Sequence, residues 1–596
     1  MWELSANEII KMIALLCGGL AFFMYGMNVM SSGLEKMAGG KLEGMLRKAT
    51  SNPFKSLGLG AGITVAIQSS SAVTVMLVGL VNSGIMVLRQ TIGVIMGSNI
   101  GTTLTAWLLA FNGTDTEGSP FLTVLKPAVF ALVFALIGIG VTMFSKKEKH
   151  HSIAYIVVGF AILIYGMEMM GDSMECFQTV PEAAFDKVLE FFQNPLFGVL
   201  IAAVFTGVIQ SSAASIGILM TFAAIPGMNI TFEIAIPIIM GQNIGTCVTA
   251  LISSIGVTKN AKRVSVVHIL FNVIGTVVFL AIYYIAKETI GLPDAITTAE
   301  INGYGIAAVH TVFNVLATAM LMPFSKWLEK AAYLIIRDSE KTETLAFIDD
   351  RLLATPSVAI AECDRKTREM AKMAQSTILS SLGLLSQYDE KIAQSLYKEE
   401  DELDFYEDKL GTVLVQLSSK ALSDQDSKRV AKQLHTIDDF ERIGDHAINL
   451  VKAAQEMNEK NIAFSAEAAA ELKIATDALT EILEITTESF CKEDLALAAK
   501  VEPLEQVIDR IMDKIKARHI ERLQNGKCTI QLGFILTDVL NNFERISDHC
   551  SNIAVALIET KQNAFDAHEY LNGIKQAGDP EYETAYLNYR QKYAIK

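Results

Sequence analysis

Long apolar segments in the first 330 residues are the feature that most constrains this fold. A helix needs about 20 residues to cross a bilayer. Seven segments reach that length: 11–30, 88–111, 124–144, 152–171, 230–256, 264–286 and 303–323. In lipid, backbone N–H and C=O groups must pair inside the protein, and a helix pairs them within one segment. The sequence therefore predicts an all-α chain whose residues 1–330 form a polytopic membrane domain in the lipid bilayer.

Positive charge marks the cytoplasmic loops of such a domain. The basic stretches are Lys36 to Lys48, SKKEKHH at 145–151, KNAKR at 259–263 and the segment after Pro323. The stretches 112–119 and 172–194 are acidic. We expect a plasma-membrane protein whose N-terminus is outside and whose C-terminal domain is cytoplasmic. The first apolar stretch has almost no preceding positive charge and no small-residue cleavage site, which favours a retained helix over a signal peptide.

Two further apolar segments, 54–83 and 196–222, must enter and leave on the same side, and both belong to a repeat. The matching pairs are MYGM at 24–27 with IYGM at 164–167, NPF at 52–54 with NPL at 194–196, IQSSSA at 67–72 with IQSSAA at 209–214, and IMGSNIGTTLTA at 95–106 with IMGQNIGTCVTA at 239–250. We predict two inverted repeats, about 10–144 and 152–286, each with a re-entrant hairpin. An extra helix at about 303–323 follows. Inverted repeats with interrupted segments are typical of secondary transporters.

The duplicated polar tips predict a binding site. Ser hydroxyls and helix N-termini suit an oxyanion, and amide and hydroxyl oxygens suit a hard cation such as Na⁺. Ser and Thr can instead serve helix packing, but their duplication in order favours a site. No Lys or Arg lies near the midplane, so a dianion would need donors, dipoles and bound cations. His268 and His310 share a His-x-x-Phe-Asn pattern. Packing is the favoured interpretation for them, with a proton relay or a site-lining role as the alternatives.

These motifs resemble the sodium/phosphate cotransporter family related to the animal type II carriers, over about residues 10–325. The resemblance implies Na⁺ as coupling ion and inorganic phosphate as substrate. It also implies a set of substrate- and sodium-binding residues: Gln68, Ser69, Ser70, Ser71, Asn99, Thr102, Gln210, Ser211, Ser212, Asn243 and Thr246. In the second half Ala213 replaces the third Ser, and Cys247 stands opposite Thr103. One hydroxyl is therefore missing there, which leaves the number of sodium ions open.

The C-terminal part differs in charge and in periodicity. Residues 341–596 hold 31 Lys and Arg against 45 Asp and Glu, whereas residues 1–340 hold 19 against 20. After a linker at 331–349, apolar residues at three- and four-residue steps predict a soluble bundle at 350–562. Its six helices form two three-helix repeats: 357–388, 391–420, 425–457, 464–491, 496–524 and 530–561. A tail at 563–596 follows. An acidic soluble part argues against nucleic acid as a partner.

Carboxylates four residues apart recur in this bundle, in DDFERIGDH at 438–446, in NNFERISDH at 541–549 and in the helix before each. Such a pair shares one helix face, and facing helices can build a metal site. Alternatively, the pairs form a solvated face. The segment resembles PhoU, which implies an iron- or zinc-like metal held by Glu400, Asp404, Glu441, Asp445, Glu505, Asp509, Glu544 and Asp548. His446 and His549 are further candidates for ligands.

Together these features predict a sodium-coupled phosphate symporter with a cytoplasmic PhoU-like regulatory domain. The same site could serve a phosphate exporter, or a phosphate sensor without net transport. An enzyme is disfavoured because the sequence has no P-loop, nucleophile elbow or catalytic triad signature. The seven cysteines show no close pairing, which fits a reducing cytosol. A homodimer or a regulatory protein partner is left open.

Overall fold

The computed structural model describes residues 6–38, 52–111, 127–173, 189–225, 227–338, 346–420, 422–562 and 580–595. Every regular element within these ranges is a helix, so the predicted all-α class is confirmed. The chain divides into two compact units, Met1–Val358 and Ala359–Lys596. The acidic part of the sequence lies mostly in the second unit.

The first unit contains the apolar helices. They are α1 (Ala6–Ala38), α3 (Pro53–Ile67), α4 (Ser70–Asn82), α5 (Leu88–Ala110), α7 (Pro127–Phe144), α8 (Glu148–Asp172), α10 (Pro195–Ile209), α11 (Ser212–Ala223), α12 (Phe232–Ser253), α13 (Lys259–Ile290), α14 (Gly303–Leu321) and α15 (Ser325–Ile335). In the described part of the chain, six helical stretches are long and apolar enough to cross a membrane. They match six of the seven predicted spans. The seventh, 124–144, corresponds to the shorter α7.

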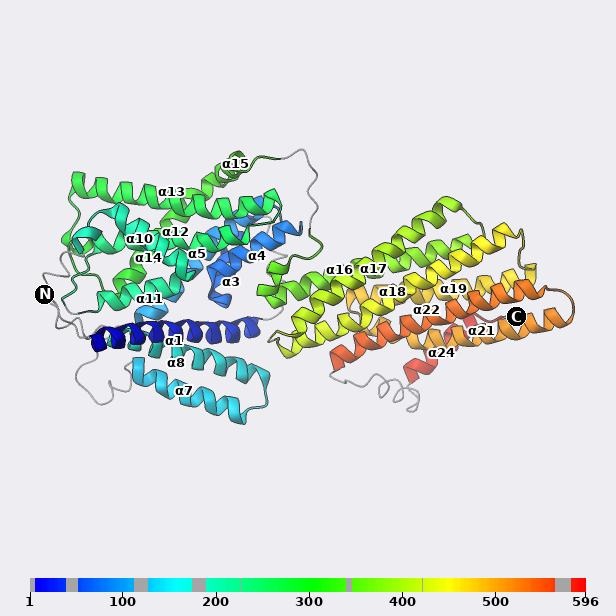
Figure 1. The fold of residues 1–596 in the computed structure, drawn as a ribbon. Helices are drawn as coiled ribbons and strands as arrows, with labels where there is room; N and C mark the ends of the chain where they lie inside the picture. The colour runs from blue at the N-terminus through cyan, green and yellow to red at the C-terminus, as the bar shows by residue number, and fades with distance from the viewer. Residues whose placement is uncertain are drawn as a thin grey trace. The chain divides into compact units, whose positions relative to one another are not determined.

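Helices α1 and α8 lie side by side in this unit, with α7 next to α8 (Figure 1). Small residues make this close packing possible. An ideal Cβ on Gly26 would lie 2.4 Å from the backbone nitrogen of Leu163, and one on Gly159 would lie 2.4 Å from that of Met30. The duplicated YGM motifs supply two of the glycines at this contact, Gly26 and Gly166. These motifs therefore have a packing role.

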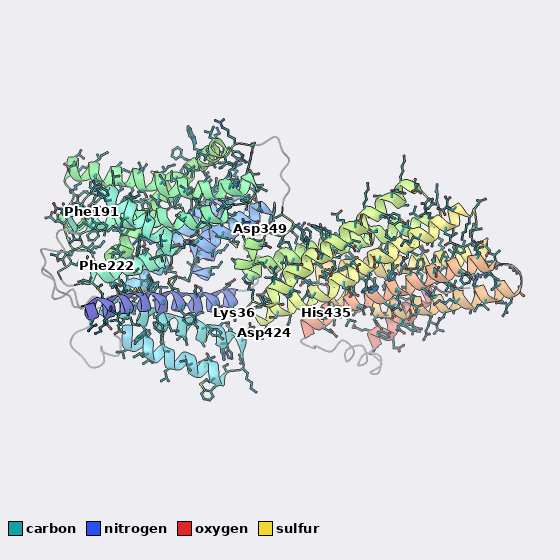
Figure 2. The ribbon with its side chains drawn as sticks, in the orientation of Figure 1. Lys36, Phe191, Phe222, Asp349, Asp424 and His435 are labelled. Atoms are coloured by element: carbon teal, nitrogen blue, oxygen red, sulfur yellow. The ribbon has the colours of Figure 1, made fainter. Side chains whose placement is uncertain are left out.

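A short helix, η5 (Asp350–Ala354), completes the first unit and leads into the second. Asn82 Nδ2, at the end of α4, donates to Oδ2 of Asp349 (2.5 Å). Figure 2 labels Asp349. Arg351 donates to the carbonyl oxygens of Ser253 (2.6 Å), the last residue of α12, and of Ile255 (2.8 Å), just beyond it. The buried side chain of Leu352 covers α4 at Gly79. Residues 349–352 therefore tie the ends of α4 and α12 together.

The second unit is a helical bundle. Its helices are α16 (Pro356–Leu384), α17 (Glu390–Ser418), α18 (Asp424–Glu459), α19 (Ala466–Lys492), α20 (Leu495–Ala498), α21 (Val501–Gln524), α22 (Ile530–Gln562) and α24 (Pro580–Lys592). The six long helices lie close to the predicted ranges. Helix α24, which was not predicted, packs against α21, and Tyr593 Oη donates to the backbone carbonyl of Asp477 (3.4 Å). Part of the C-terminal tail is therefore docked on the bundle.

Candidate functional site

Four helices that carry the duplicated motifs pack around one another in the first unit. Helix α4 contacts α5 from its own sequence repeat and α12 from the other. Helix α11 likewise contacts α12 and α5. The QSS and NIGT motifs, about 140 residues apart in the sequence, therefore belong to a single cluster of helices. Figure 1 shows α4, α5, α11 and α12 within the first unit.

The two copies share a close helix–helix contact, which the first glycine of each MG-x-NIG motif makes possible. An ideal Cβ on Gly97 would lie 1.9 Å from Leu57 O, and one on Gly241 would lie 2.2 Å from Val199 O. No real Cβ atom fits at such distances, so only glycine permits this approach. The first helix of each hairpin, α3 or α10, consequently rests directly on the helix that carries NIGT.

The first hairpin turns at Gln68, whose backbone is left-handed with φ of 56°. Three hydrogen bonds hold this turn. The Gln68 backbone N–H donates to Thr64 O (2.6 Å), its Nε2 donates to Val65 O (2.8 Å), and its Oε1 accepts from Thr105 Oγ1 (2.8 Å). Because both ends of its amide are engaged, Gln68 acts in this structure as the support of the turn.

The second hairpin repeats the turn with a different side-chain arrangement. Gln210 has φ of 57°, and its N–H donates to Thr206 O (2.7 Å). Its side chain is exposed, and no hydrogen bond to it occurs within the described ranges. Gln210 therefore has an amide available to a ligand, whereas Gln68 does not.

The serines at the two tips fall into two groups. Ser69 and Ser211 are N-caps, whose hydroxyls accept from the backbone N–H of Ala72 (3.1 Å) and Ala214 (3.2 Å) respectively. A second group makes no side-chain hydrogen bond to any residue that the structure describes: Ser70, Ser71 and Ser212. Their hydroxyls are free to donate to a bound anion. The first N–H groups of a helix lack intrahelical partners, so α4 and α11 add backbone donors beside these hydroxyls.

The NIGT residues are buried in the helices behind the tips. Thr102 and Thr246 each donate to a carbonyl four residues earlier in their own helix, those of Ser98 (3.0 Å) and Gln242 (2.9 Å). Each hydroxyl oxygen keeps acceptor capacity. Asn99 Nδ2 donates to Asn272 Oδ1 (3.4 Å), and Asn243 Oδ1 lies 3.3 Å from His310 Nε2. Helices α13 and α14 thus contribute to the site.

Several polar residues of this cluster were not among the predicted site residues. Thr64 Oγ1 lies 2.6 Å from Ser98 Oγ, and Thr206 Oγ1 donates to Ser215 Oγ (2.8 Å). Gln242 Nε2 donates to Ser215 O (3.0 Å). The repeat itself carried a signal for one pair, because Thr64 and Thr206 stand at the same distance before the two QSS motifs.

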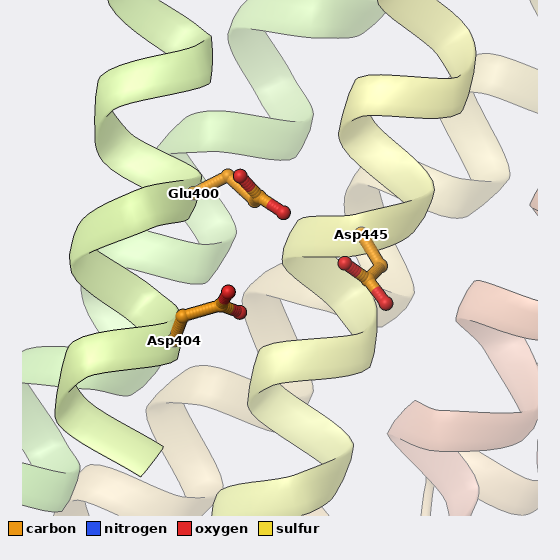
Figure 3. A group of neighbouring side chains, drawn as sticks. All are labelled: Glu400, Asp404 and Asp445. Atoms are coloured by element: carbon orange, nitrogen blue, oxygen red, sulfur yellow. The ribbon is translucent and has the colours of Figure 1, made fainter. Parts of the chain in front are cut away.

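In the described part of the second unit, two groups of three acidic side chains come together. Glu400 and Asp404 on α17 point toward Asp445 on α18, as Figure 3 shows. The equivalent residues on α21 and α22 form the second group, Glu505, Asp509 and Asp548. In each group one carboxylate oxygen per residue lies within 4.8 Å of the others. The groups bring together three of the four acids predicted for each half of the bundle.

Proximity and burial change the proton affinity of these acids. Burial raises the pKa of Glu505 to about 8, with further contributions from Glu502 and Asp509. The pKa of Asp509 is also raised, first by burial and then by Asp548. In the other half, burial and then Asp404 raise the pKa of Glu400. Three ionised carboxylates in one group would therefore repel one another, and a bound cation would reduce that repulsion.

The remaining predicted acids lie at the edges of these groups. Burial, followed by Asp445 and Asp404, raises the pKa of Glu441 to about 7. Glu544 Oε2 instead forms an ion pair with Lys516 Nζ (2.9 Å). The rings of His446 and His549 lie next to each other in a tilted arrangement, with centroids 5.6 Å apart and an interplanar angle of 34°. Their hydrogen bonds run to Asn542 (2.8 Å) and Asp439 (2.8 Å), outside both acidic groups.

Comparisons with known proteins agree with both halves of this description. A Na⁺/Pi-cotransporter family model matches residues 22–172 and 173–293. A PhoU domain model matches residues 367–454 and 472–557. The chain is similar to a protein of Escherichia coli (strain K12) with the name "Putative inorganic phosphate export protein YjbB". The two are 21% identical over 567 residues, which cover 93% of this chain and 99% of that protein.

Two further relatives match one part of the chain each. The human sodium-dependent phosphate transport protein 2B is 38% identical over 101 residues, which cover 16% of this chain and 14% of that protein. The Thermotoga maritima phosphate-specific transport system accessory protein PhoU homolog 1 is 29% identical over 143 residues, which cover 24% of this chain and 60% of that protein. By its apolar helices the chain is a multi-pass membrane protein; its residues 22–293 match the Na⁺/Pi-cotransporter family, and its residues 367–557 match the PhoU domain.

Proposed function

We propose that this protein is a sodium-coupled symporter of inorganic phosphate. The observation that carries the proposal is the pair of hairpin tips with unengaged serine hydroxyls at the N-termini of α4 and α11. Oriented N–H groups at a helix N-terminus favour a bound oxyanion. Ser70, Ser71 and Ser212 would donate to phosphate, with Gln210 as a further donor. Ser69, Ser211 and Gln68 would hold the two tips in shape.

Sodium has a distinct role in this proposal. The motif segments QSS and NIGT contain no Lys or Arg, so no fixed positive side chain of these motifs would balance a phosphate dianion. Hard cations prefer oxygen ligands. Carbonyl and hydroxyl oxygens of Asn99, Thr102, Asn243 and Thr246 would bind Na⁺ next to the anion. Co-binding lowers the cost of burying the phosphate charge, which couples the two fluxes.

The membrane arrangement is part of the proposal. Helices α3 and α4 have 15 and 13 residues, and α10 and α11 have 15 and 12. All four are shorter than the roughly 20 residues that a membrane span needs. We infer two re-entrant hairpins in inverted repeats, in the plasma membrane, with the N-terminus outside and the PhoU-like domain in the cytoplasm. The basic loops support this orientation.

The acidic groups of the bundle would hold a regulatory metal. Each group offers three converging carboxylates, an all-oxygen donor set that suits a hard cation. This favours iron over zinc, which more often takes nitrogen and sulfur ligands. Glu441 and Glu544 would join only after a change of side-chain conformation. A bound cation would remove the repulsion within each group and so stabilise the contact of α17 with α18 and of α21 with α22.

Export of phosphate through the same site is the second candidate function. It is favoured by the name of the E. coli relative, which aligns over 93% of this chain. Import and export would use the same binding residues, because the affinity of the site for its ligands does not depend on the direction of the gradient. The direction therefore depends on the gradients and on the regulatory domain.

Purified protein in liposomes tests the proposal. A sodium gradient directed inward should drive uptake of radiolabelled phosphate, and an equal choline gradient should not. A gradient of phosphate alone, with sodium equal on both sides, should drive flux in either direction. Phosphate flux that is indifferent to sodium would contradict the coupling. Binding of phosphate without any flux would instead identify a sensor.

A further inference from the structure

Helices α13 and α14 carry a second duplicated pattern, His-x-x-Phe-Asn-Val-x-x-Thr. It reads HILFNVIGT at 268–276 and HTVFNVLAT at 310–318. Residues four apart share one helix face, so each helix has a polar stripe of His, Asn and Thr. All six of these polar side chains are at least nine-tenths buried. Buried polar groups normally have hydrogen-bond partners, so the stripes require an explanation.

Asn272 in the first stripe has a fixed orientation. Its Nδ2 donates to His268 O (3.1 Å) and to Cys247 Sγ (3.2 Å) on α12. With its donor group held on that side, the Asn272 Oδ1 atom faces Asn99 on α5 and accepts from its Nδ2 (3.4 Å). These hydrogen bonds, from Cys247 through Asn272 to Asn99, connect the residue that follows the second NIGT motif with the asparagine of the first. Cys247, which stands in the place of Thr103 in the first copy, supplies one of the anchors.

These hydrogen bonds determine which end of the Asn99 amide remains free. The Nδ2 group is engaged by Asn272, and Asn99 Oδ1 accepts no hydrogen bond from any residue that the structure describes. A carbonyl oxygen is the part of an amide that binds a hard cation. Rotation of the amide by half a turn would present two N–H donors instead, which would repel a cation.

The corresponding residues of the second copy differ. Asn243 donates through Nδ2 to Ile239 O in its own helix (2.9 Å), and its Oδ1 faces His310 Nε2 (3.3 Å). Asn314, the counterpart of Asn272, donates only to His310 O (2.9 Å), and its Oδ1 has no hydrogen-bond partner. Among the residues that the structure describes, Asn314 therefore makes no hydrogen bond to a NIGT asparagine. The two asparagines share residue type, burial and motif position but differ in this contact.

We propose that Asn272 is a positioning residue for the cation site: it holds the Asn99 amide so that its carbonyl oxygen is presented to sodium. The inference deepens the proposed sodium coupling and rests on it. In this interpretation the buried polar contact between Asn272 and Cys247 serves cation recognition in the first half of the site. Asn314 has no such role.

Sodium titration of thermal stability tests this assignment without depending on transport. All three tryptophans, at positions 2, 107 and 327, lie in the first unit, so tryptophan fluorescence of the full-length protein in detergent follows that unit. A ligand that binds the folded state raises its stability with concentration, which yields a sodium midpoint. The variants are Asn272→Leu, which removes the acceptor, Asn272→Asp, which retains it, and Asn314→Leu as the matched control.

We expect Asn272→Leu to raise the sodium midpoint about tenfold, the effect of one lost hydrogen bond. Asn272→Asp should restore the midpoint toward wild type, and Asn314→Leu should leave it unchanged even if it lowers the melting temperature. An unchanged midpoint in Asn272→Leu would overturn the inference. So would an equal rise in Asn314→Leu, or a wild type that does not respond to sodium. If sodium binds as expected but liposomes show no phosphate flux, the transport proposal fails and this inference stands.

Discussion

Replacement of Glu505 by Gln gives the sharpest test of the acidic group on α21 and α22. The pKa of Glu505 rises from its ordinary value of 4.5 to about 8. The folded state thus holds this proton more tightly than the unfolded state does. The resulting stability is present below pH 4.5 and is lost as the pH rises toward 8. Each pH unit in that window corresponds to about 1.4 kcal/mol, so at pH 7 the cost is on the order of 3 kcal/mol.

Two results follow for the metal-free protein. The stability of α21 and α22 should fall between pH 5 and pH 8 in the wild type, and Glu505→Gln should remove most of that fall because it removes the ionising group. Added iron or manganese should stabilise the wild type at pH 8, where Glu505 is about half ionised and a bound cation would displace its remaining proton. It should stabilise Glu505→Gln much less, since one ligand oxygen has lost its charge.

Hydrogen–deuterium exchange of peptides from α21 and α22 in the full-length protein measures both effects. Helices α16 and α19, which carry no acid of either group, serve as an internal comparison, and Glu521→Gln is the matched control, because Glu521 is exposed on the same helix as Glu505. Protection that stays constant from pH 5 to pH 8, or a response to metal that Glu505→Gln and Glu521→Gln share equally, would refute the reasoning. The acids would then be a solubilising surface.

Three other predictions concern the membrane domain. Gly97→Ala and Gly241→Ala should each cost about 3 kcal/mol or more, because the new methyl group meets a backbone oxygen. Tryptophan fluorescence melting should show this loss, and Gly140→Ala, which meets no atom within 4 Å, should be near neutral. Arg351→Ala should lower the stability of the first unit by about 2 kcal/mol through lost hydrogen bonds, measured by the same melting. Single cysteines at 114 and 183 should react with impermeant reagents on intact cells, and one at 148 should not; the reverse pattern would overturn the inverted topology.

Motif duplication was sufficient to predict where the two interrupted apolar segments, 54–83 and 196–222, break into pairs of shorter helices. The helices break at the two QSS motifs because serine is a favoured N-cap residue, so a new helix can begin directly after it. Ser69 and Ser211 are the N-caps of α4 and α11. The left-handed backbone at Gln68 and Gln210 was not predictable, because residues other than glycine rarely adopt positive φ. At both residues the backbone N–H donates to the carbonyl four residues earlier, and at Gln68 a hydrogen bond from Thr105 Oγ1 adds support from another helix.

Contacts between distant helices were beyond the reach of sequence patterns. The pairing of Asn272 with Asn99 joins residues 173 positions apart, and periodicity reports only which residues share a face of one helix. The same limit applies to the acidic groups. Spacing identified the faces of α18 and α22, but the ion pair of Glu544 with Lys516 depends on how α21 lies against α22.

Phosphate binding by Ser70 and Ser212 variants tests most directly whether the two motif copies form one site. Isothermal titration of the full-length protein in saturating sodium would give the dissociation constants of wild type, Ser70→Ala, Ser212→Ala and the double variant. Each single change should weaken binding by about 1–3 kcal/mol, the value of a donor to a buried anion. The double variant should depart from additivity by 0.5 kcal/mol or more, as groups that share a ligand do. Wild-type affinity in both single variants, or strictly additive losses, would contradict a single shared site.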